Sequence, residues 1–522
     1  MTSGWAKRLR RRLARTSLLF FIAATAVIIV GSATSVTVTK ASKAQYGGYF
    51  IRAYYENANA PVTGCTLPCL AVDTQATQPA GSNSFSLANG ANLYLWSPQL
   101  AAATTISAGT WGVDFWASAL SYIPLTITNN QGSATPNPFQ VKVTWNPSTY
   151  SSYEGSALGN VRFCADIACN TMLYGWLESC TPSCSASATS ASAWVKLTSA
   201  IAAGGGTLTI YMVFLASSTP FDTSYWGEAP SLSGTYGQYD NGANVFTFYD
   251  NFAGPSLSSK WTWIASASGV SFTVSNGLTV TTSTTSAYGF VISANQAYPA
   301  VAETYTSSGN SILGVSTSQA VNNFIAPYRG YSMDWYSGYD DIESEGATSA
   351  QMTTLGQATF PTGVWQVTWS ATGTEYFLDG KGVNYNGTNP GNTIANYGIY
   401  VGQSNGVKAS SVFSWARMRA FPPGNVMPTV SKGTLTVNKM SVSAYITDST
   451  GAVVATMATN VQSPAIGTAV AEYGMNFAGS QVTVPANGYI SLVITVSTDS
   501  CTIYWGGVRP TNFQVSYTYR ST

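Results

Sequence analysis

Most of the chain after Lys40 alternates between apolar and polar residues with a period of two. Ile, Leu, Val, Met, Phe or Trp occupies every second position of residues 123–127, 208–214, 365–369 and 490–496. Such alternation predicts β-strands with one buried face. Clusters of Gly, Asn, Ser and Pro separate these stretches, and no stretch keeps a helical period over three turns. The pattern predicts an all-β fold of several β-sandwich or jelly-roll domains.

The first forty residues have a different pattern. Residues 1–15 contain six Lys or Arg, and residues 16–39 carry no charge. A basic flank before an apolar run is typical of a membrane anchor or a signal peptide, and about 20 residues span a bilayer. We therefore expect a cytoplasmic basic segment at 1–15 and a single transmembrane anchor at 16–39. Small residues at 31–35 leave the alternative of a cleaved signal and a secreted protein.

Charge composition changes the list of expected partners. Only 8% of residues are charged, and past residue 15 there are 16 basic against 21 acidic residues. This weakly acidic part of the chain lacks the basic stripe of a nucleic-acid-binding protein. It has no histidine, so it lacks the commonest general base and zinc ligand. We expect no enzyme activity, no metal and no cofactor, with calcium bound by carboxylates as the alternative.

Six of the seven cysteines form close pairs in the sequence. Outside the cell, short-loop disulfides are the expected state of such pairs, with free thiols or a zinc site as the alternatives. Cys501 is left over. The expected pairs are Cys65/Cys69, Cys164/Cys169 and Cys180/Cys184.

Two regions of the chain resemble known surface modules. Residues 120–234 resemble a prokaryotic β-sandwich catalogued as domain of unknown function 2341. The resemblance is most specific at "YWGE" (225–228) and at "YDNG" (239–242), which lies just after that range. Residues 245–423 are similar to a concanavalin-A/laminin-G-like jelly roll, with an Asp379-Gly380 turn that favours a hairpin. The resemblance implies an archaeal or bacterial surface protein without an established activity. Asn386 begins an Asn-Gly-Thr glycosylation sequon after that hairpin.

The remaining pieces, 41–118 and 433–522, are predicted to form one split sandwich next to the membrane. The first ends in an "AGTW" strand, and the second contains an "ITDSTG" hairpin and a "PANG" turn before a last strand. The rest of the chain would then be an insertion at a loop tip, where insertions are tolerated. Residues 111–116 should pair or pack with the strands at 436–446 or 489–505.

An acidic and aromatic stretch in the jelly roll is the candidate site. Asp341, Glu343 and Glu345 would share one face of a strand, which resembles the carboxylate row of certain glycoside hydrolases, although the order Asp-x-Glu-x-Glu departs from that family. Aromatic rings beside acids suit sugar binding, while a calcium site, a solvated edge and core aromatics are the alternatives. The full set is Trp335, Tyr336, Tyr339, Asp340, Asp341, Glu343 and Glu345.

These observations favour a membrane-anchored extracellular protein that acts in adhesion or glycan binding. Its expected partners are the membrane, surface glycans and neighbouring surface proteins. A structural subunit of a surface layer, filament or virion is one alternative, because low charge suits dense packing between proteins. A glycoside hydrolase that uses the carboxylate row is the other.

Overall fold

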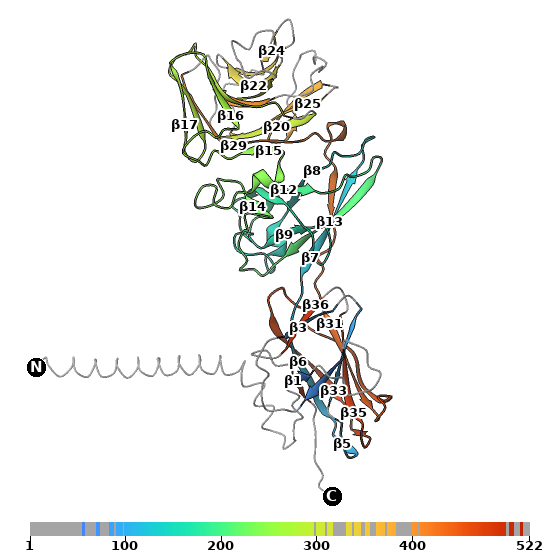
Figure 1. Cartoon of the computed structure of the whole chain (residues 1–522). Helices are drawn as coiled ribbons and strands as arrows, with labels where there is room; N and C mark the ends of the chain where they lie inside the picture. The colour runs from blue at the N-terminus through green and yellow to red at the C-terminus, as the bar shows by residue number, and fades with distance from the viewer. Residues whose placement is uncertain are drawn as a thin grey trace, which may run out of the picture. The chain divides into compact units, whose positions relative to one another are not determined.

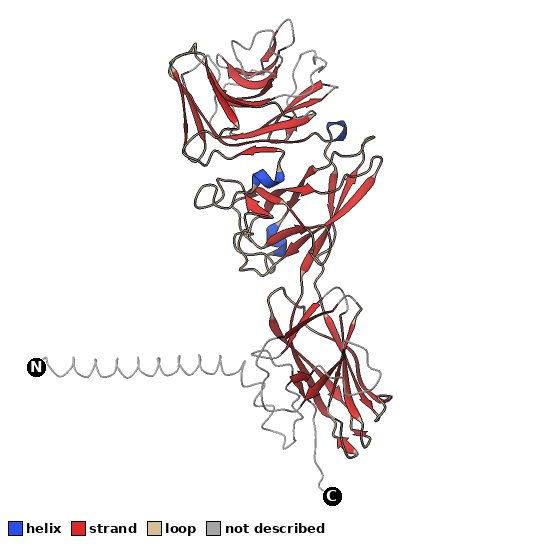
Figure 2. Ribbon diagram, viewed as in Figure 1, coloured by secondary structure: helices blue, strands red, loops and turns tan. Residues whose placement is uncertain are grey.

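The computed structural model describes an all-β protein, as the alternation predicts (Figures 1 and 2). Its described helices are single turns: η1 (Pro147–Tyr150), α2 (Gly242–Val245) and η2 (Pro423–Asn425). No helix in the described part of the chain is long and apolar enough to cross a bilayer. Residues 16–39, the predicted anchor, lie outside that part. The structure describes residues 55–57, 69–73, 83–87, 90–97, 99–296, 299–307, 311–316, 330–336, 339–345, 350–354, 362–370, 373–382, 398–403, 408–496, 501–505 and 512–514.

The chain divides into two compact units. Unit 1 takes its described residues from 1–117, 439–464 and 471–522, and unit 2 comprises 118–438 and 465–470. Strands from both ends of the chain therefore share the sheets of unit 1. Its first sheet has the order β1 (Tyr55–Asn57), β2 (Cys69–Asp73), β4 (Asn92–Trp96), β35 (Tyr489–Val496), β31 (Met440–Thr447), β32 (Val453–Gln462).

The second sheet of unit 1 is built around β6 (Gly109–Ser118). Trp111, Val113 and Phe115 alternate along this strand and are fully buried. β6 lies between β36 and β33, two strands from the C-terminal part of the chain. The sheet has the order β3 (Asn83–Leu87), β36 (Cys501–Trp505), β6, β33 (Ala471–Gly479), and β37 (Asn512–Gln514) also pairs with β6. A separate two-stranded sheet consists of β5 (Thr104–Ile106) and β34 (Val482–Val484).

Unit 2 begins with a sandwich of two sheets. Residues 433–438 were predicted to belong to the split sandwich, but they form hydrogen bonds with the first sandwich of unit 2. For example, the Gly433 amide donates a hydrogen bond to the Pro124 carbonyl. One sheet has the order β10 (Met172–Leu173), β9 (Val161–Cys164), β13 (Gly206–Phe214), β7 (Ser121–Asn129), β30 (Thr429–Lys432), and the other β14 (Trp226–Glu228), β11 (Gly175–Thr181), β12 (Ser190–Leu197), β8 (Phe139–Trp145).

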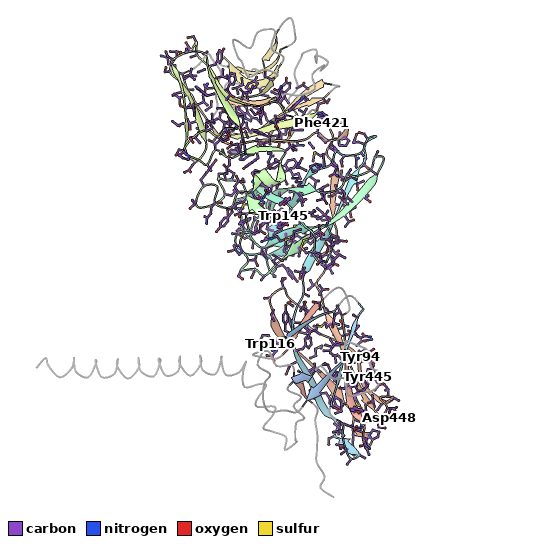
Figure 3. The ribbon with its side chains drawn as sticks, viewed as in Figure 1. Tyr94, Trp116, Trp145, Phe421, Tyr445 and Asp448 are labelled. Atoms are coloured by element: carbon purple, nitrogen blue, oxygen red, sulfur yellow. A yellow bond between two sulfur atoms is a disulfide. The ribbon has the colours of Figure 1, made fainter. Side chains whose placement is uncertain are left out.

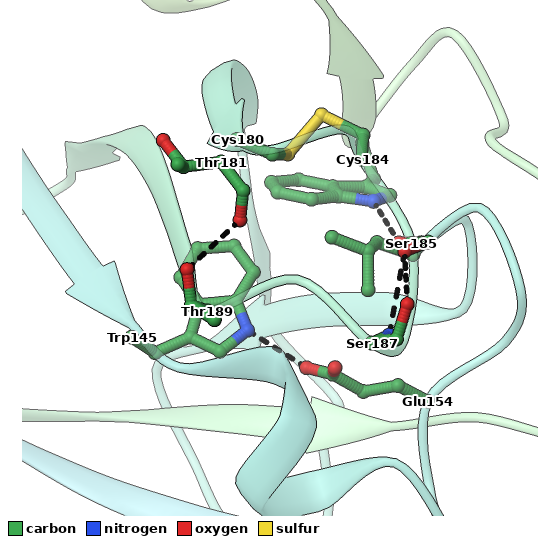
Figure 4. Close-up of a disulfide and its surroundings, with 10 residues drawn as sticks. Trp145, Glu154, Cys180, Thr181, Cys184, Ser185, Ser187 and Thr189 are labelled. Carbon is green, nitrogen blue, oxygen red and sulfur yellow. Dashed lines mark hydrogen bonds between the residues drawn. A yellow bond between two sulfur atoms is a disulfide. The ribbon is translucent and has the colours of Figure 1, made fainter.

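A carboxyl group lies inside this first sandwich. Glu154 is 4% exposed, and its Oε1 accepts a hydrogen bond of 2.7 Å from Nε1 of Trp145 (Figure 4). Figure 3 labels Trp145 within the whole chain. Its Oε2 has no hydrogen-bond partner among the described residues. Burial raises the pKa of Glu154 to about 7, against the smaller lowering effect of the Trp145 bond.

The jelly roll forms the rest of unit 2, and Trp365, Val367 and Trp369 alternate into its core. Its hairpin turn lies at Asp379 and Gly380, as predicted, and both have positive φ. One sheet has the order β17 (Val270–Val274), β18 (Leu278–Thr282), β29 (Ser410–Ala420), β20 (Ala300–Thr306), β25 (Gly363–Ser370), β26 (Gly373–Leu378), β27 (Lys381–Gly382), with β15 (Phe248–Asp250) on β29. The other has the order β16 (Trp261–Ala265), β19 (Gly289–Ser293), β28 (Gly398–Gln403), β21 (Ser311–Ser316), β22 (Gly330–Tyr336), β23 (Tyr339–Glu345), β24 (Ala350–Thr354).

Candidate functional site: a cavity between the two sandwiches of unit 2

The predicted acidic and aromatic stretch forms two paired strands, β22 and β23. Trp335 lies opposite Asp340, and Tyr336 lies opposite Tyr339. Asp341, Glu343 and Glu345 occupy alternate positions of β23, which pairs with β24 on its other side. The side chains of these residues lie outside the described part of the structure. The glycan, calcium and hydrolase interpretations of this stretch therefore stay predictions.

Two of the three predicted disulfides are confirmed. Cys164 is bonded to Cys169 in the loop between β9 and β10, and Cys180 is bonded to Cys184 at the end of β11 (Figure 4). Each closes a short loop, so each restrains the chain locally. Cys501 is buried, with 1% exposure. Cys65 lies outside the described residues, and so does Asn386.

A cavity of about 530 Å³ lies within unit 2, lined by residues of both the first sandwich and the jelly roll. Its volume falls in the range of ligand-binding pockets. Ionised side chains come to it from strands that are distant in sequence. They are Lys142 (β8), Glu178 (β11), Glu303 (β20), Asp379 (the β26–β27 turn), and Arg417 and Arg419 (both β29).

The alternation of β29 explains how it contributes to this cavity. Ala416 and Met418 point into the jelly-roll core. Trp415, Arg417 and Arg419 are offset from them by one residue, so they occupy the opposite face of the strand, and all three line the cavity. One strand thus presents an apolar face to its own core and a cationic face to the first sandwich.

Five of the charged side chains form a chain of alternating sign across the junction. Lys142 Nζ lies 2.6 Å from Glu178 Oε2, and Glu178 Oε1 lies 2.6 Å from Arg417 Nη2. Arg417 Nε lies 2.6 Å from Glu303 Oε2, whose Oε1 is 3.0 Å from Arg419. Four of the five side chains are at most 6% exposed, and Lys142 is 43% exposed.

These pairs keep the network ionised. Burial alone would raise the pKa of Glu178, but the charges of Arg417 and then Lys142 outweigh burial and lower that pKa to about 2. Burial also opposes ionisation of Glu303 and Arg417. In both cases the charges of the ion-pair partners outweigh the effect of burial. The pKa of Glu303 is therefore lowered and the pKa of Arg417 is raised.

Aromatic rings surround the Arg417 guanidinium. Its central carbon lies 4.3 Å from the ring centroid of Trp415, 4.5 Å from Phe246 and 5.0 Å from Trp194. Trp194 also donates from Nε1 to Glu178 at 2.9 Å. The rings stabilise the cation through their faces and exclude water from it. Arg417 Nη1 is buried and has no hydrogen-bond partner among the described residues.

Asp240, in the "YDNG" sequence, supports the tryptophan beneath Arg417. Its Oδ1 accepts from Trp176 Nε1 at 2.8 Å and from the Gly242 amide at 3.0 Å, and its Oδ2 accepts from Tyr249 at 2.8 Å and Asn251 at 2.7 Å. Trp176 lies 5.1 Å from the Arg417 guanidinium. Asp240 thus positions one wall of the aromatic cluster.

Asp240→Asn is expected to destabilise the protein by about 2 kcal/mol, because the new amide group would face two donors that now bond to a carboxylate oxygen. Urea unfolding at neutral pH measures the loss. Asp448→Asn, at an exposed turn of unit 1, is the control and should leave stability nearly unchanged. Equal effects of the two variants would contradict the role given to Asp240.

The sequence analysis missed this cavity. A signal for it was present in "WLESC" and "WARMRA", where Glu178, Arg417 and Arg419 interrupt apolar strands in a chain with only 8% charged residues. Charges at such positions are rarely buried unless they are paired. The pattern therefore indicates that partners exist, but it does not say which strands supply them.

No family model matches the chain. The chain is 29% identical over 353 residues to an uncharacterized protein, 562, of Sulfolobus islandicus rod-shaped virus 1, a match that covers 62% of the chain. The chain spans 61% of that relative's length.

Two similar solved structures each cover about a third of the chain. A β-glucanase of Bacillus licheniformis is 11% identical, with 33% of this chain and 97% of that one covered and a TM-score of 0.24. A protein of unknown function with a galectin-like fold from Bacillus subtilis is 9% identical, with 34% and 96% covered and a TM-score of 0.26. At such scores these similarities support no inference about activity or ligand.

Proposed function

We propose that this chain is a non-catalytic extracellular binding protein and that it binds carbohydrate in the cavity of unit 2. The observation that carries the proposal is the cavity itself, which combines half-buried aromatic side chains with convergent charged and amide groups. Sugars offer apolar ring faces to aromatic side chains and hydroxyls to polar ones, so the lining matches that chemistry.

Two further features support an extracellular location. The basic and apolar pattern of residues 1–39 is that of an anchor or signal, and two disulfides are formed among the described residues. Disulfides persist mainly in oxidising compartments. The proposal therefore keeps the membrane as one partner, through residues 16–39, and surface glycans as the other.

Tyr305→Ala is expected to weaken glycan binding about tenfold, because Tyr305 lines the cavity beside Trp415 and supplies stacking surface. A glycan array probed with the full chain selects the ligand, and titration calorimetry then measures affinity. Tyr211→Ala is the matched control, since Tyr211 is also half-buried in unit 2 but does not line the cavity. Absence of any glycan binding, or equal weakening by both variants, would refute the proposal.

A structural subunit of a virion or surface layer is the second candidate, and the viral relative favours it. Under this proposal the chain would be found in stoichiometric amounts in purified particles or cell envelopes. Mass spectrometry of that material, with antibody labelling in the electron microscope, tests it. A protein detected only in the medium, never in an assembly, would contradict it.

A further inference from the structure

We infer that the cavity of unit 2 selects uncharged sugars and discriminates against the matching uronic acids. The inference rests on the proposed function and names the ligand class for that same site. Three features of the lining support it: the balance of its charges, one exposed carboxylate, and two half-buried aromatic rings.

The charges of the lining are already matched within the protein. Three cations and three carboxylates line the cavity, and each cation is paired: Lys142 with Glu178, Arg417 with Glu178 and Glu303, and Arg419 with Glu303. A ligand carboxylate would have to compete with these buried glutamates for the same cations. It would lose its hydration without gaining a counter-charge, which is unfavourable.

Asp379 adds an exposed negative charge to the lining. Its side chain is exposed at the β26–β27 turn, and its Oδ1 accepts a 2.7 Å hydrogen bond from the Val364 amide. Among the lining residues it is the carboxylate without an ion pair in the described structure. It would repel an anionic sugar and accept hydrogen bonds from the hydroxyls of a neutral one.

Arg417 is closed to a ligand, because its side chain is only 1% exposed and its guanidinium is paired with Glu178 and Glu303. A ligand carboxylate therefore cannot pair with this cation without separating it from its partners. The half-buried rings of Tyr305 and Phe377 provide the apolar surface for the face of the sugar.

Matched pairs of ligands test the inference. The full chain is titrated with methyl glycosides of glucose, galactose and mannose and with the corresponding uronic acids, which differ only by a carboxylate at C6. We expect at least one neutral sugar to bind about tenfold more tightly than its uronic acid. Its affinity should be nearly independent of salt, since screening acts on charged partners.

Asp379→Asn sharpens the test, because asparagine also tolerates positive φ and can still accept from the Val364 amide. We expect this variant to lower the ratio of neutral-sugar affinity to uronic-acid affinity about fivefold, because it removes the charge that repels the ligand carboxylate. Asp448→Asn is the matched control, since Asp448 also accepts backbone amides through Oδ1 at an exposed turn, but in unit 1.

The outcomes separate the inference from the proposed function. Tighter binding of uronic acids by the wild-type chain, or affinity that falls steeply with salt, overturns the charge argument and leaves glycan binding in place. No binding of any sugar overturns the proposed function and the inference together. Preference for a neutral sugar that Tyr305→Ala abolishes and Tyr211→Ala does not supports both.

Discussion

Arg417→Met is expected to destabilise unit 2 by about 3 kcal/mol. The change removes the cation between two buried carboxylates, and a buried charge that loses its partner is strongly unfavourable. Lys142 and Arg419 remain on the outer oxygens, so the loss should lie at the lower end of the range for broken buried pairs. Denaturant unfolding followed by tryptophan fluorescence measures it, because Trp176, Trp194 and Trp415 surround this residue.

A control and a conservative variant identify the cause. Lys142→Met removes a 43% exposed member of the same network and should cost less than about 1 kcal/mol. Arg417→Lys keeps a cation beside both Glu178 and Glu303, so it should lose less stability than Arg417→Met. If Arg417→Lys were as unstable as Arg417→Met, lost packing of the guanidinium rather than lost charge would be responsible.

Glu154 is expected to make stability fall by about 3 kcal/mol as the pH rises from 4.5 to 7. The fold raises the pKa of this acid from 4.5 to about 7, so between these values the folded chain holds a proton that the unfolded chain has released. Below pH 4.5 both states are protonated and the effect vanishes, and above pH 7 the full loss persists.

Glu154→Gln should abolish this dependence, because glutamine keeps the oxygen that accepts from Trp145 and cannot ionise. The measurement is the free energy of unfolding in urea at several pH values between 4 and 8, compared with the wild type. Glu375→Gln, at an exposed position, should keep the wild-type dependence. A difference between wild type and Glu154→Gln that stayed constant with pH would contradict the assignment.

Local patterns predicted the fold well. The alternating residues of β6 and β25, the Asp379-Gly380 turn and two of the short disulfides could all be read from the chain, because each depends on neighbours within a few residues. Alternation with a period of two indicates which face of a strand is buried, and a turn sequence indicates where the chain reverses direction.

The cavity could not be predicted in this way. Glu178 and Arg417 are 239 residues apart, and their contact depends on which strands the sandwich and the jelly roll present to each other. The density of acids and aromatics in the sequence favours residues 335–345 instead. The cavity shows a second arrangement, in which isolated charges from β8, β11, β20 and β29 converge only after folding.

The shared sheets of unit 1 also have a consequence for biosynthesis. β4 and β6 leave the ribosome before all of unit 2, and their partners β35, β33 and β36 emerge only afterwards. At usual rates of translation the early strands wait on the order of tens of seconds with unpaired edges. Unit 2 can fold in that interval, and unit 1 closes last. The nascent chain would therefore need a chaperone, or early translocation, to keep those waiting edges from pairing with other chains.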